Sequence, residues 1–500
     1  MNRRLPEDVL RLHTLPGAAA GEITATDTRM TREPRIRLIQ AFQAIVGRDG
    51  VISTPDELRV YESDALTTRH KAMPELVVLP INTDQVASIV RLCATEGVPI
   101  VPRGAGTGLS GGAIPTAGGV LITLTRMTRI LEIDVPNRTA TVEAGCVNLA
   151  ISRAAMSRGF FFAPDPASQQ ASSIGGNVAE NAGGPHCLKY GATTNHVLGA
   201  TVVLPDGEVV QLGGRMADRP GYDLLGVFVG SEGTLGICTE VIVRLLPLPQ
   251  AVKTILGVFR NLEDPSNAVS SIIARGIIPV ALEMIDQETT QAVEAYAKAG
   301  YPVDAGAVLL IELEGLDAEI AAEAIAVEGA CREHHCLDVK VARSEEERAL
   351  LWKGRKAAAG AFGRMTRNYY HQDAVVPRTK LTAVLREIAE IGARYGVRVP
   401  NVFHAGDGNI HPLLCYDDRV PGQYEQAMAA GDEIMRCCIR AGGTVSGEHG
   451  IGLEKRDYLR LMYSEDDLAA MQRIRQVLDP TGRCNPGKIF PDAEPGRAAA

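Results

Sequence analysis

The chain has 500 residues, of which 45% are hydrophobic and 22% are charged, and its formal net charge is −9. This length is enough for two or three hydrophobic cores, and the negative charge argues against a nucleic acid or an anionic membrane surface as a partner. No apolar run approaches the roughly 18–20 residues of a transmembrane helix, and the N-terminus lacks the apolar core of a signal peptide. We therefore expect a cytoplasmic protein. Its ten cysteines include no CxxC pair and no tight group of about four, which an iron–sulfur cluster would need.

The first half of the chain reads as short strands joined by turns and one helix. Residues 1–49 are predicted to be an N-terminal extension. Apolar and alternating runs predict strands at 75–79, 98–101, 120–124, 130–134, 140–143, 201–204 and 209–212. A helix is expected to begin at Asn82 or Thr83 and to end at Gly97. The turn residues Pro-Asp-Gly-Glu at 205–208 predict a tight hairpin.

The pattern of the sequence changes near residues 247–249, where two prolines occur. Beyond them, strands predicted at 253–258 and 308–313 alternate with long alanine-rich helices, which is typical of a sheet backed by helices. We therefore predict an α+β protein with a domain boundary at residue 248. Its predicted parts are an extension, two domains and a disordered tail, at 1–49, 50–248, 249–490 and 491–500.

The glycine-rich segment 102–112 contains Gly-x-Gly-x-x-Gly at 106–111, the fingerprint of nicotinamide-dependent dehydrogenases. In those enzymes the loop opens a helix that faces the pyrophosphate, but Gly112 and Pro115 follow here and disfavour a helix. A glycine-dense loop still binds phosphate when its backbone N–H groups converge on the anion, and Arg103 adds a positive charge. The segment therefore predicts a phosphate-binding loop outside the nicotinamide pattern, with a plain multi-glycine turn as the alternative.

A histidine-rich hairpin is predicted nearer the end of the chain. The Asp407-Gly408 pair favours a two-residue turn, which places His404 directly opposite His411 with Cβ atoms about 5 Å apart. Two imidazoles so placed can hold one divalent ion, and Glu448 in the run Ser-Gly-Glu-His-Gly supplies a third ligand. Two histidines and a carboxylate suit zinc, manganese, iron or cobalt. Two stacked structural histidines are the alternative.

Seven motifs occur in order along the chain: PRGAGTGLSGG, PDPASQQASSIGGNVAENAGG, HCLKYG, GSEGTLGI, HAGDGNIHP, SGEHGIG and NPGK. Together they resemble the FAD-linked oxidases of the vanillyl-alcohol-oxidase type, and among these the FAD-binding chains of glycolate oxidase, with D-lactate and D-2-hydroxyglutarate dehydrogenases as relatives. The resemblance implies an FAD-binding domain of the PCMH type at 50–248. It also implies a substrate domain with a ferredoxin-like β-sheet at 249–490, whose last segment returns to the flavin.

A second stretch rich in glycine and asparagine spans residues 172–191. The resemblance assigns FAD contacts to the segment 102–112, to this second glycine-rich segment with the residues just before it, and to two later motifs. The assigned residues are Arg103, Gly104, Ala105, Gly106, Thr107, Gly108, Leu109, Ser110, Gly111, Pro164, Asp165, Ser168, Gly175, Gly176, Asn181, Gly184, Glu232, Gly233, Ile237 and Asn485. Some members of the wider superfamily attach FAD covalently through a histidine in the first loop, where this chain has Thr107. Noncovalent FAD is therefore expected.

The same resemblance implies oxidation of a small 2-hydroxy acid. His449 would be the general base, because an imidazole with a pKa of about 6.5 suits removal of a hydroxyl proton at neutral pH. Arg355 would bind the substrate carboxylate; the alternative for this residue is a position on a solvated helix face. His371 and Asn409 complete the predicted catalytic set. D-2-hydroxyglutarate enzymes tend to have lysine in place of His371, so glycolate or D-lactate is the expected substrate. Another D-2-hydroxy acid, or a metal-dependent hydrolase built on the histidine pair and Glu448, are the alternatives.

The resemblance also implies partners for electron transfer. These are a second FAD-domain subunit and an iron–sulfur subunit of a glycolate oxidase complex, which pass electrons towards quinone and hold the protein peripherally at the inner membrane. The lack of cluster-binding cysteines in this chain agrees with such partners. It equally fits a direct oxidase or a client of an electron-transfer flavoprotein.

Overall fold

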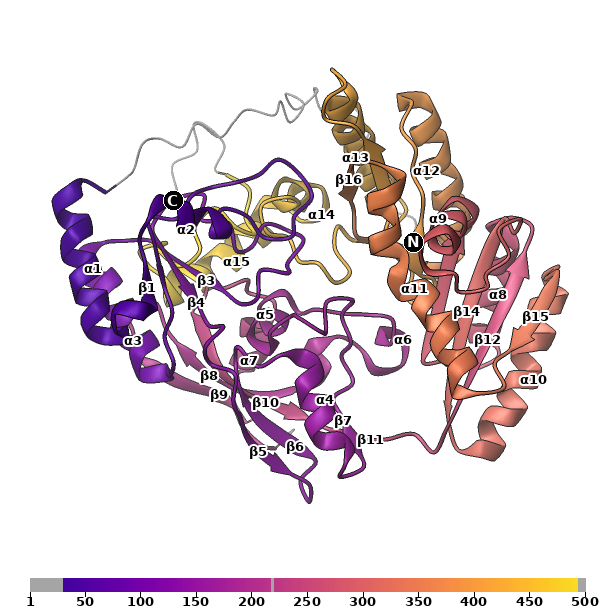
Figure 1. Ribbon diagram of the computed structural model, residues 1–500, viewed down its shortest axis with the longest axis horizontal. Coiled ribbons are helices and arrows are strands. Elements are labelled where there is room, and N and C mark those ends of the chain that lie inside the picture. Colours follow the sequence, from indigo (N-terminus) through magenta and orange to yellow (C-terminus); the bar gives the residue numbers. More distant parts are fainter. Residues whose placement is uncertain (1–29, 217–219, 493–500) are drawn as a thin grey trace.

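The computed structural model describes residues 30–216 and 220–492, so the first 29 residues and most of the predicted tail lie outside the described chain. The molecule has two lobes (Figure 1). The first, coloured indigo to magenta, holds the strands up to β10 (Ile237–Arg244), and the second, in salmon and orange, holds a sheet that starts with β12 (Ala251–Phe259). The chain passes from one lobe to the other between β10 and β12, and its yellow C-terminal segment returns to lie against the first lobe.

The first sheet of the N-terminal lobe has the strand order β1-β2-β4-β3. Its strands are β1 (Val51–Ile52), β2 (Leu76–Val78), β3 (Ile100–Arg103) and β4 (Val120–Thr123). The last three run parallel and β1 runs antiparallel. As predicted, α3 (Thr83–Glu96) is capped by the Asn82 side chain and ends at Gly97 in a left-handed conformation. Within the predicted extension, α1 (Arg32–Val46) packs on this unit through the buried Phe42.

The second sheet of this lobe is antiparallel throughout and has the order β5-β6-β10-β8-β9. Its other strands are β5 (Ile130–Asp134), β6 (Thr139–Glu143), β8 (Val197–Val203) and β9 (Val209–Gly213). The predicted hairpin is confirmed, because Val203 pairs with Val209. Arg215, just after β9, forms ion pairs with Glu132 and Asp134 on β5. The two edges of this sheet, β5 and the end of β9, therefore lie close to each other.

The C-terminal lobe contains a sheet of order β15-β12-β14-β13-β18-β19-β17. Its main elements are α8 (Glu263–Ala274), β13 (Ala281–Asp286), α9 (Gln287–Ala297), β14 (Ala307–Gly315), α10 (Asp317–Glu333), β15 (Asp338–Val341), α11 (Glu345–Met365), β17 (Ala374–Val375), α12 (Leu381–Tyr395), β18 (Val402–His404), β19 (Asn409–Ile410) and α13 (Gln423–Arg440). The units β12-α8-β13 and β14-α10-β15 interleave in the order β15-β12-β14-β13. This is the ferredoxin-like arrangement that the resemblance implies, with α9 inserted between the two units.

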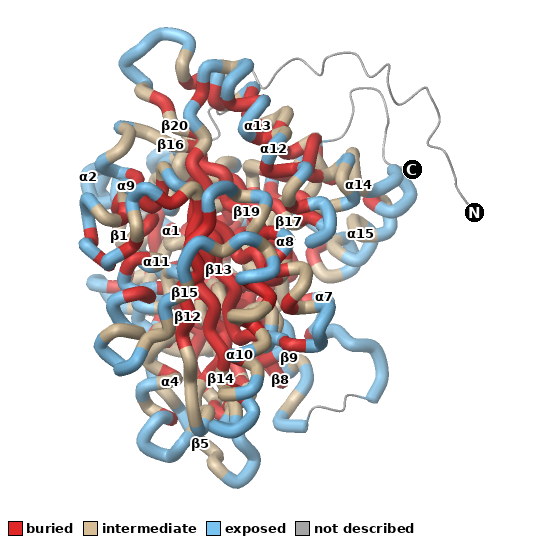
Figure 2. The backbone as a smooth tube through the Cα atoms, turned by 90° about the vertical axis from the view of Figure 1, so that its right-hand side faces the viewer, coloured by how far each residue is buried: buried red, intermediate tan, exposed pale blue. Residues whose placement is uncertain are grey.

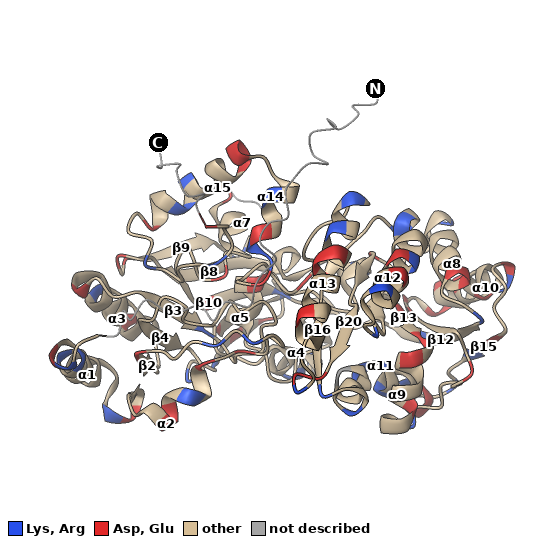
Figure 3. Cartoon of the chain, turned by 90° about the horizontal axis from the view of Figure 1, so that it is seen from above, with Lys and Arg blue, Asp and Glu red and all other residues tan. Residues whose placement is uncertain are grey.

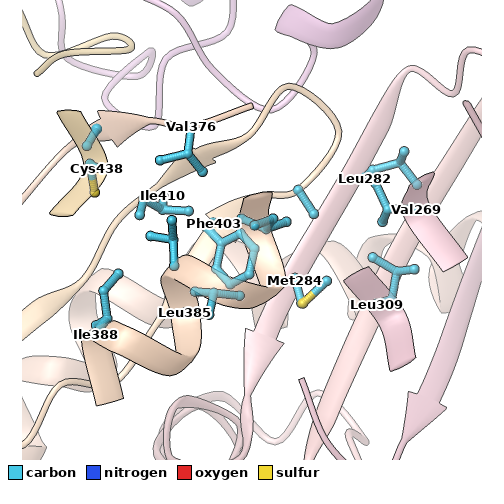
Figure 4. Packing of buried hydrophobic residues seen from close by; sticks show 14 of the residues in the cluster. Val269, Leu282, Met284, Leu309, Val376, Leu385, Ile388, Phe403, Ile410 and Cys438 are labelled. Atoms are coloured by element: carbon cyan, nitrogen blue, oxygen red, sulfur yellow. The ribbon is translucent and has the colours of Figure 1, made fainter. Parts of the chain in front are cut away.

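β13 is buried on both faces. Successive side chains of a strand point to opposite sides, and helices cover both sides of this strand. Met284 packs with α8, α10 and α12, whereas Ile285 packs with α9 and α11. The strands β12 to β14 form a buried band through the lobe (Figure 2). Figure 4 shows Met284 and Phe403 beside Leu385 of α12. The strand pair that carries His404 is therefore fixed by packing on both sides.

The last described segment returns to the first sheet. After α15 (Glu465–Leu478), Cys484 forms a parallel bridge with Ile100 on β3, and the Asn485 N–H donates to the carbonyl of Ile100 at 2.8 Å. The C-terminal residues therefore extend the edge of that sheet. The remaining helices and strands are α2 (Pro55–Leu58), α4 (Asn148–Met156), β7 (Phe160–Phe161), α5 (Ile174–Glu180), α6 (Cys187–Tyr190), α7 (Leu224–Phe228), β11 (Leu246–Pro247), β16 (Asn368–His371), β20 (Leu413–Tyr416) and α14 (Leu459–Met462).

Acidic and basic side chains are interspersed over the helices of both lobes (Figure 3). Many are paired, as Arg394 on α12 is with Glu433 on α13 at 2.9 Å. Such exposed pairs contribute about 0–1 kcal/mol each, so the fold rests on its cores. Within the described ranges, no helix is both long and apolar enough to cross a membrane.

Candidate active site

A cavity of about 470 Å³ lies between the two glycine-rich segments and extends to Glu448 and His449. Thirteen of the residues assigned to FAD line it. They are Arg103, Gly104, Ala105, Gly106, Thr107, Gly108, Leu109, Ser168, Gly175, Gly176, Glu232, Gly233 and Ile237. Because Gly175 and Gly176 come from the second glycine-rich segment and Ser168 from the residues just before it, both parts of the chain form the cavity.

Glycine is required in these walls by close approach. A Cβ on Gly175 would lie 2.7 Å from Ala144 Cβ, and one on Gly233 would lie 2.2 Å from Pro102 Cγ. Gly106 has φ +72°, in the left-handed region that favours glycine. As predicted, no helix follows the loop: the described residues between β3 and β4 form turns and bends only. A phosphate in this cavity would therefore meet loop backbone rather than a Rossmann helix.

The other residues assigned to FAD are not among the described residues that line the cavity. They are Ser110, Gly111, Pro164, Asp165, Asn181, Gly184 and Asn485. Asp165 pairs with His186 at 3.1 Å. The Asn485 side-chain amide donates to the carbonyls of Gly112 and Glu232 at 2.8 and 2.7 Å. Asn485 thus ties two walls together from behind the cavity surface.

The proposed metal ligands meet at the other end of the cavity. Nε2 of His404 and Nε2 of His411 lie 3.4 and 3.2 Å from the same Glu448 oxygen, Oε1. One ligand atom from each of these residues lies within 4.8 Å of the others. Both histidines are about 95% buried. The arrangement can enclose one small cation.

The predicted register of the histidine hairpin is wrong. His404 pairs with Asn409, not with His411, because the turn spans four residues, 405–408. The N–H groups of Ala405 and Gly406 donate to the carbonyl of Leu282 on β13, so they are unavailable for pairing within the hairpin. The shift is by two residues, which preserves the facing of side chains. The two rings therefore still meet, with centroids 5.1 Å apart.

Glu283 on β13 links the metal ligands to Arg355. Its Oε1 accepts from His404 Nδ1 at 2.7 Å, and its Oε2 accepts from Arg355 Nε at 2.6 Å. Burial opposes the charge of His404, but Glu283 and Glu448 raise the pKa of this imidazole well above its ordinary value. Arg355 supports His404 through Glu283 and does not line the cavity. Sequence reasoning missed Glu283, although a lone glutamate in the apolar run Ala-Leu-Glu-Met-Ile was a signal.

Three imidazoles gather where Glu448 and His449 enter the cavity. The His449 ring stacks on His411 with centroids 5.2 Å apart, and His371 meets both rings edge-on at 5.0 and 5.3 Å. Burial lowers the pKa of His449 to about 4 and lowers that of His371 well below its ordinary value. His371 Nε2 and His449 Nδ1 have no hydrogen-bond partner among the described residues. These neutral rings can therefore accept or donate a hydrogen bond to a bound molecule.

Asp373 anchors the loop that carries Glu448 and His449, here termed the active-site loop (residues 446–452). Its carboxylate accepts from Ser446 Oγ at 2.8 Å and from the N–H groups of Gly447 and His449 at 3.0 and 3.1 Å. Lys455 Nζ donates to it at 3.0 Å, and both side chains are fully buried. Burial opposes its charge, yet Lys455 keeps the pKa of Asp373 well below its ordinary value. Asp373 stands two residues after His371, the only sequence signal that pointed to it.

The fold and the shared cavity define a flavoprotein oxidoreductase. Residues 74–213 match the FAD binding domain family, and residues 248–489 match the family of FAD linked oxidases, C-terminal domain. The chain belongs to the FAD-linked oxidases of the vanillyl-alcohol-oxidase (PCMH) type, as its motifs predict, and it is an FAD-dependent enzyme. The Gly-x-Gly-x-x-Gly segment at 106–111 therefore belongs to an FAD-binding domain and not to a nicotinamide-dependent dehydrogenase.

Individual relatives agree with this family. The chain is 44% identical to glycolate oxidase subunit GlcD of Escherichia coli strain K12, over 91% of each protein. It is 35% identical to D-lactate dehydrogenase of Anaerostipes hadrus, over 90% of this chain and 97% of that protein. The crystal structure of p-cresol methylhydroxylase with substrate bound superposes with a TM-score of 0.77 at 17% identity, covering 92% of this chain and 97% of the other. This last likeness concerns the fold alone.

Proposed function

We propose that the protein oxidises a small 2-hydroxy acid, glycolate or D-lactate, to the 2-oxo acid with noncovalently bound FAD. The observation that carries the proposal is a single cavity lined by the glycine-rich loop at one end and by Glu448 and His449 at the other. The names of the relatives, a glycolate oxidase subunit and a D-lactate dehydrogenase, support this substrate class. When bound, FAD supplies the acceptor for the hydride that leaves the substrate Cα.

His449 is the residue that takes the hydroxyl proton. It lines the cavity, its ring is neutral because burial lowers its pKa to about 4, and Nδ1 is its unpartnered atom. Stacking on His411 and the hydrogen bond from its own N–H to Asp373 fix the ring and its backbone. A general base has to be held within hydrogen-bond reach of the proton it removes, and these contacts provide that restraint.

We propose that His404, His411 and Glu448 bind a divalent ion, which can be zinc, manganese, iron or cobalt. The donor set fits such an ion, because two imidazole nitrogens and a carboxylate oxygen converge in a buried space. Glu448 Oε2 is buried and has no hydrogen-bond partner in the described part of the chain. Glu283 accepts a hydrogen bond from His404 Nδ1 and so orients this ring, as carboxylates commonly do for metal-binding histidines. When bound, the ion would lower the pKa of the substrate hydroxyl.

Metal analysis of purified protein tests the metal site. Replacing His404 or His411 by alanine should remove the ion, whereas His335→Asn, an exposed histidine with positive φ, should leave it. An unchanged metal content in both alanine variants would contradict the site.

Substrate binding falls to the side chains around the imidazole cluster. His371 meets the His449 ring edge-on. Within the described chain, neither its Nε2 nor the buried side-chain oxygen of Asn409 has a hydrogen-bond partner. Arg355 stands apart from this cluster, because Glu283 holds its Nε and it does not line the cavity. We propose that His371 and Asn409 bind the carboxylate of a small acid, and that Arg355 supports the site through Glu283 and His404.

Anaerobic reduction of the bound flavin by a panel of acids tests the function. We expect rapid bleaching of the visible flavin band with glycolate or D-lactate, and slow or no bleaching with L-lactate. Bleaching by D-2-hydroxyglutarate alone would replace the proposed substrate with that acid. Metal-dependent hydrolysis that persists without flavin would favour the hydrolase alternative.

We propose that electrons leave through partners, a second FAD-domain subunit and an iron–sulfur subunit of a glycolate oxidase complex. The related protein of Escherichia coli is named a subunit. In the described ranges, the groups of side chains able to hold a metal contain histidine and glutamate but no cysteine, so a cluster in such a pathway would belong to another chain. Affinity purification from the native cell, followed by identification of the bound proteins, tests this. Fast reduction of oxygen by the isolated protein would contradict it.

A further inference from the structure

Glu180 projects its carboxyl group into the junction of the cavity walls. It ends α5 and lines the cavity. Its Oε1 lies 2.7 Å from where a Cβ on Gly112 would be, and its Oε2 lies 2.0 Å from the corresponding position on Gly450. Because these two glycines have no side chains, the carboxyl group of Glu180 has room between the phosphate-binding loop and the active-site loop.

A second carboxylate, Glu232, lies beside it. Its Oε1 is 3.0 Å from the same Cβ position on Gly450. Glu232 accepts from the N–H groups of Ile451 and Gly452 at 2.6 and 2.7 Å, one to each oxygen. Burial raises the pKa of Glu232 to about 7, although these two N–H groups, Lys488 and Lys455 favour its charged form. By contrast, Glu180 Oε2 is buried and has no hydrogen-bond partner among the described residues.

The charges that face Glu180 are mostly of its own sign. Glu232 and Asp64 face it, and Asp64 also lies at the cavity wall. Lys455 is the cation that acts on it, but the ammonium of Lys455 is hydrogen-bonded to Asp373. Lys488 acts on Glu232 and Asp64. Burial, followed by Glu232 and Asp64, raises the pKa of Glu180 well above its ordinary value, because like charges in a poorly solvated site cannot all be ionised cheaply.

We propose that Glu180 is a neutral carboxylic acid in the FAD-loaded protein and that FAD binding requires its proton. The diphosphate of FAD brings further negative charge into the cavity that Glu180 lines. An ionised Glu180 would oppose that charge, whereas the protonated group offers a hydrogen-bond donor. Binding of FAD and binding of this proton are therefore linked, each favouring the other. The proposal does not depend on which acid the enzyme oxidises or on the metal site.

The linkage predicts that FAD affinity falls with rising pH. Above the pKa of Glu180 in the FAD-free protein, the Kd for FAD should rise by up to about tenfold per pH unit. The full-length holoenzyme is diluted in buffers from about pH 6 to about pH 9, and release of FAD is followed by the increase in flavin fluorescence. Glu180→Gln, which keeps a neutral group of the same shape, should bind FAD with a Kd that rises less with pH than the Kd of the wild type.

Glu96→Gln is the matched control, because Glu96 ends α3 as Glu180 ends α5 but is exposed. It should follow the wild-type profile. Parallel pH profiles for the wild type and Glu180→Gln would overturn the proposal, and so would loss of FAD from Glu180→Gln at every pH. Calorimetry on the wild type in two buffers of different ionisation enthalpy is independent of any variant. It should detect proton uptake with FAD at alkaline pH, and no uptake would also overturn the proposal.

Discussion

Replacing Asp373 by asparagine tests whether one buried carboxylate holds the active-site loop. Four groups of that loop and Lys455 donate to Asp373 at 2.8–3.3 Å. Asparagine leaves the Lys455 ammonium buried without its counter-charge, and removal of one partner from a buried pair costs about 3–5 kcal/mol. We expect the free energy of unfolding of the C-terminal lobe to fall by that amount. The double variant Asp373→Asn/Lys455→Met removes the orphaned charge and should recover at least half of the loss.

Urea unfolding followed by tryptophan fluorescence measures this loss. Trp352 is the only tryptophan of the chain, and it is buried on α11 in the same lobe. A loss below about 1 kcal/mol in Asp373→Asn would refute the reasoning, because that is the value of an ordinary exposed contact. A double variant less stable than the single one would also refute it. Even where the double variant is stable, its flavin should be reduced slowly by substrate, because Glu448 and His449 lose their anchor.

Three further outcomes are expected. His449→Gln should keep FAD but reduce the rate of flavin reduction by about 10²–10⁴-fold, measured by anaerobic stopped flow; a smaller effect would assign the base elsewhere. Gly452→Ala should destabilise the protein by about 1–3 kcal/mol more than Gly482→Ala does. Both glycines have positive φ, but a Cβ on Gly452 would lie 2.1 Å from the carbonyl oxygen of Ser110, whereas a Cβ on Gly482 would meet no atom within 4 Å. Equal losses of stability would exclude a steric cause. Burial raises the pKa of Glu454 from 4.5 to about 7. As the pH rises from 4.5 to about 7, the unfolded state loses this proton before the folded state does. The free energy of unfolding should therefore fall over this range, by up to about 3 kcal/mol. Glu454→Gln should flatten that part of the urea-derived stability profile, and an unchanged slope would contradict the assignment.

Local signals in the sequence predicted the parts of the fold that short-range chemistry decides. The cap at Asn82, the stop at Gly97 and the turn between β8 and β9 depend on neighbouring residues only. The absence of a helix after the first glycine-rich loop was also predictable, since Gly112 and Pro115 oppose one. The second glycine-rich segment was harder, because α5 carries two glycines and is held by its Ser173 cap and by packing on β10.

Long-range contacts decided what the sequence did not predict. The hairpin register follows from the hydrogen bonds of Ala405 and Gly406 to Leu282, a residue of a distant strand. The support of His404 by Glu283, and that of the active-site loop by Asp373, likewise join segments far apart in the chain. A sequence motif identifies residues that contact a ligand more readily than it identifies the buried charged residues that position them. The positions of those charged residues depend on tertiary packing.

The return of the C-terminus to β3 sets an order of events during synthesis. Both glycine-rich segments leave the ribosome long before Asn485, whose amide joins the walls at Gly112 and Glu232. Until Cys484 reaches Ile100, β3 is an open edge strand, and open edges recruit other chains. An unfinished chain therefore has an open edge strand, and its two cavity walls at Gly112 and Glu232 are not yet joined by Asn485. Truncation shortly before residue 484 should therefore yield aggregated, colourless protein rather than a soluble FAD-binding lobe.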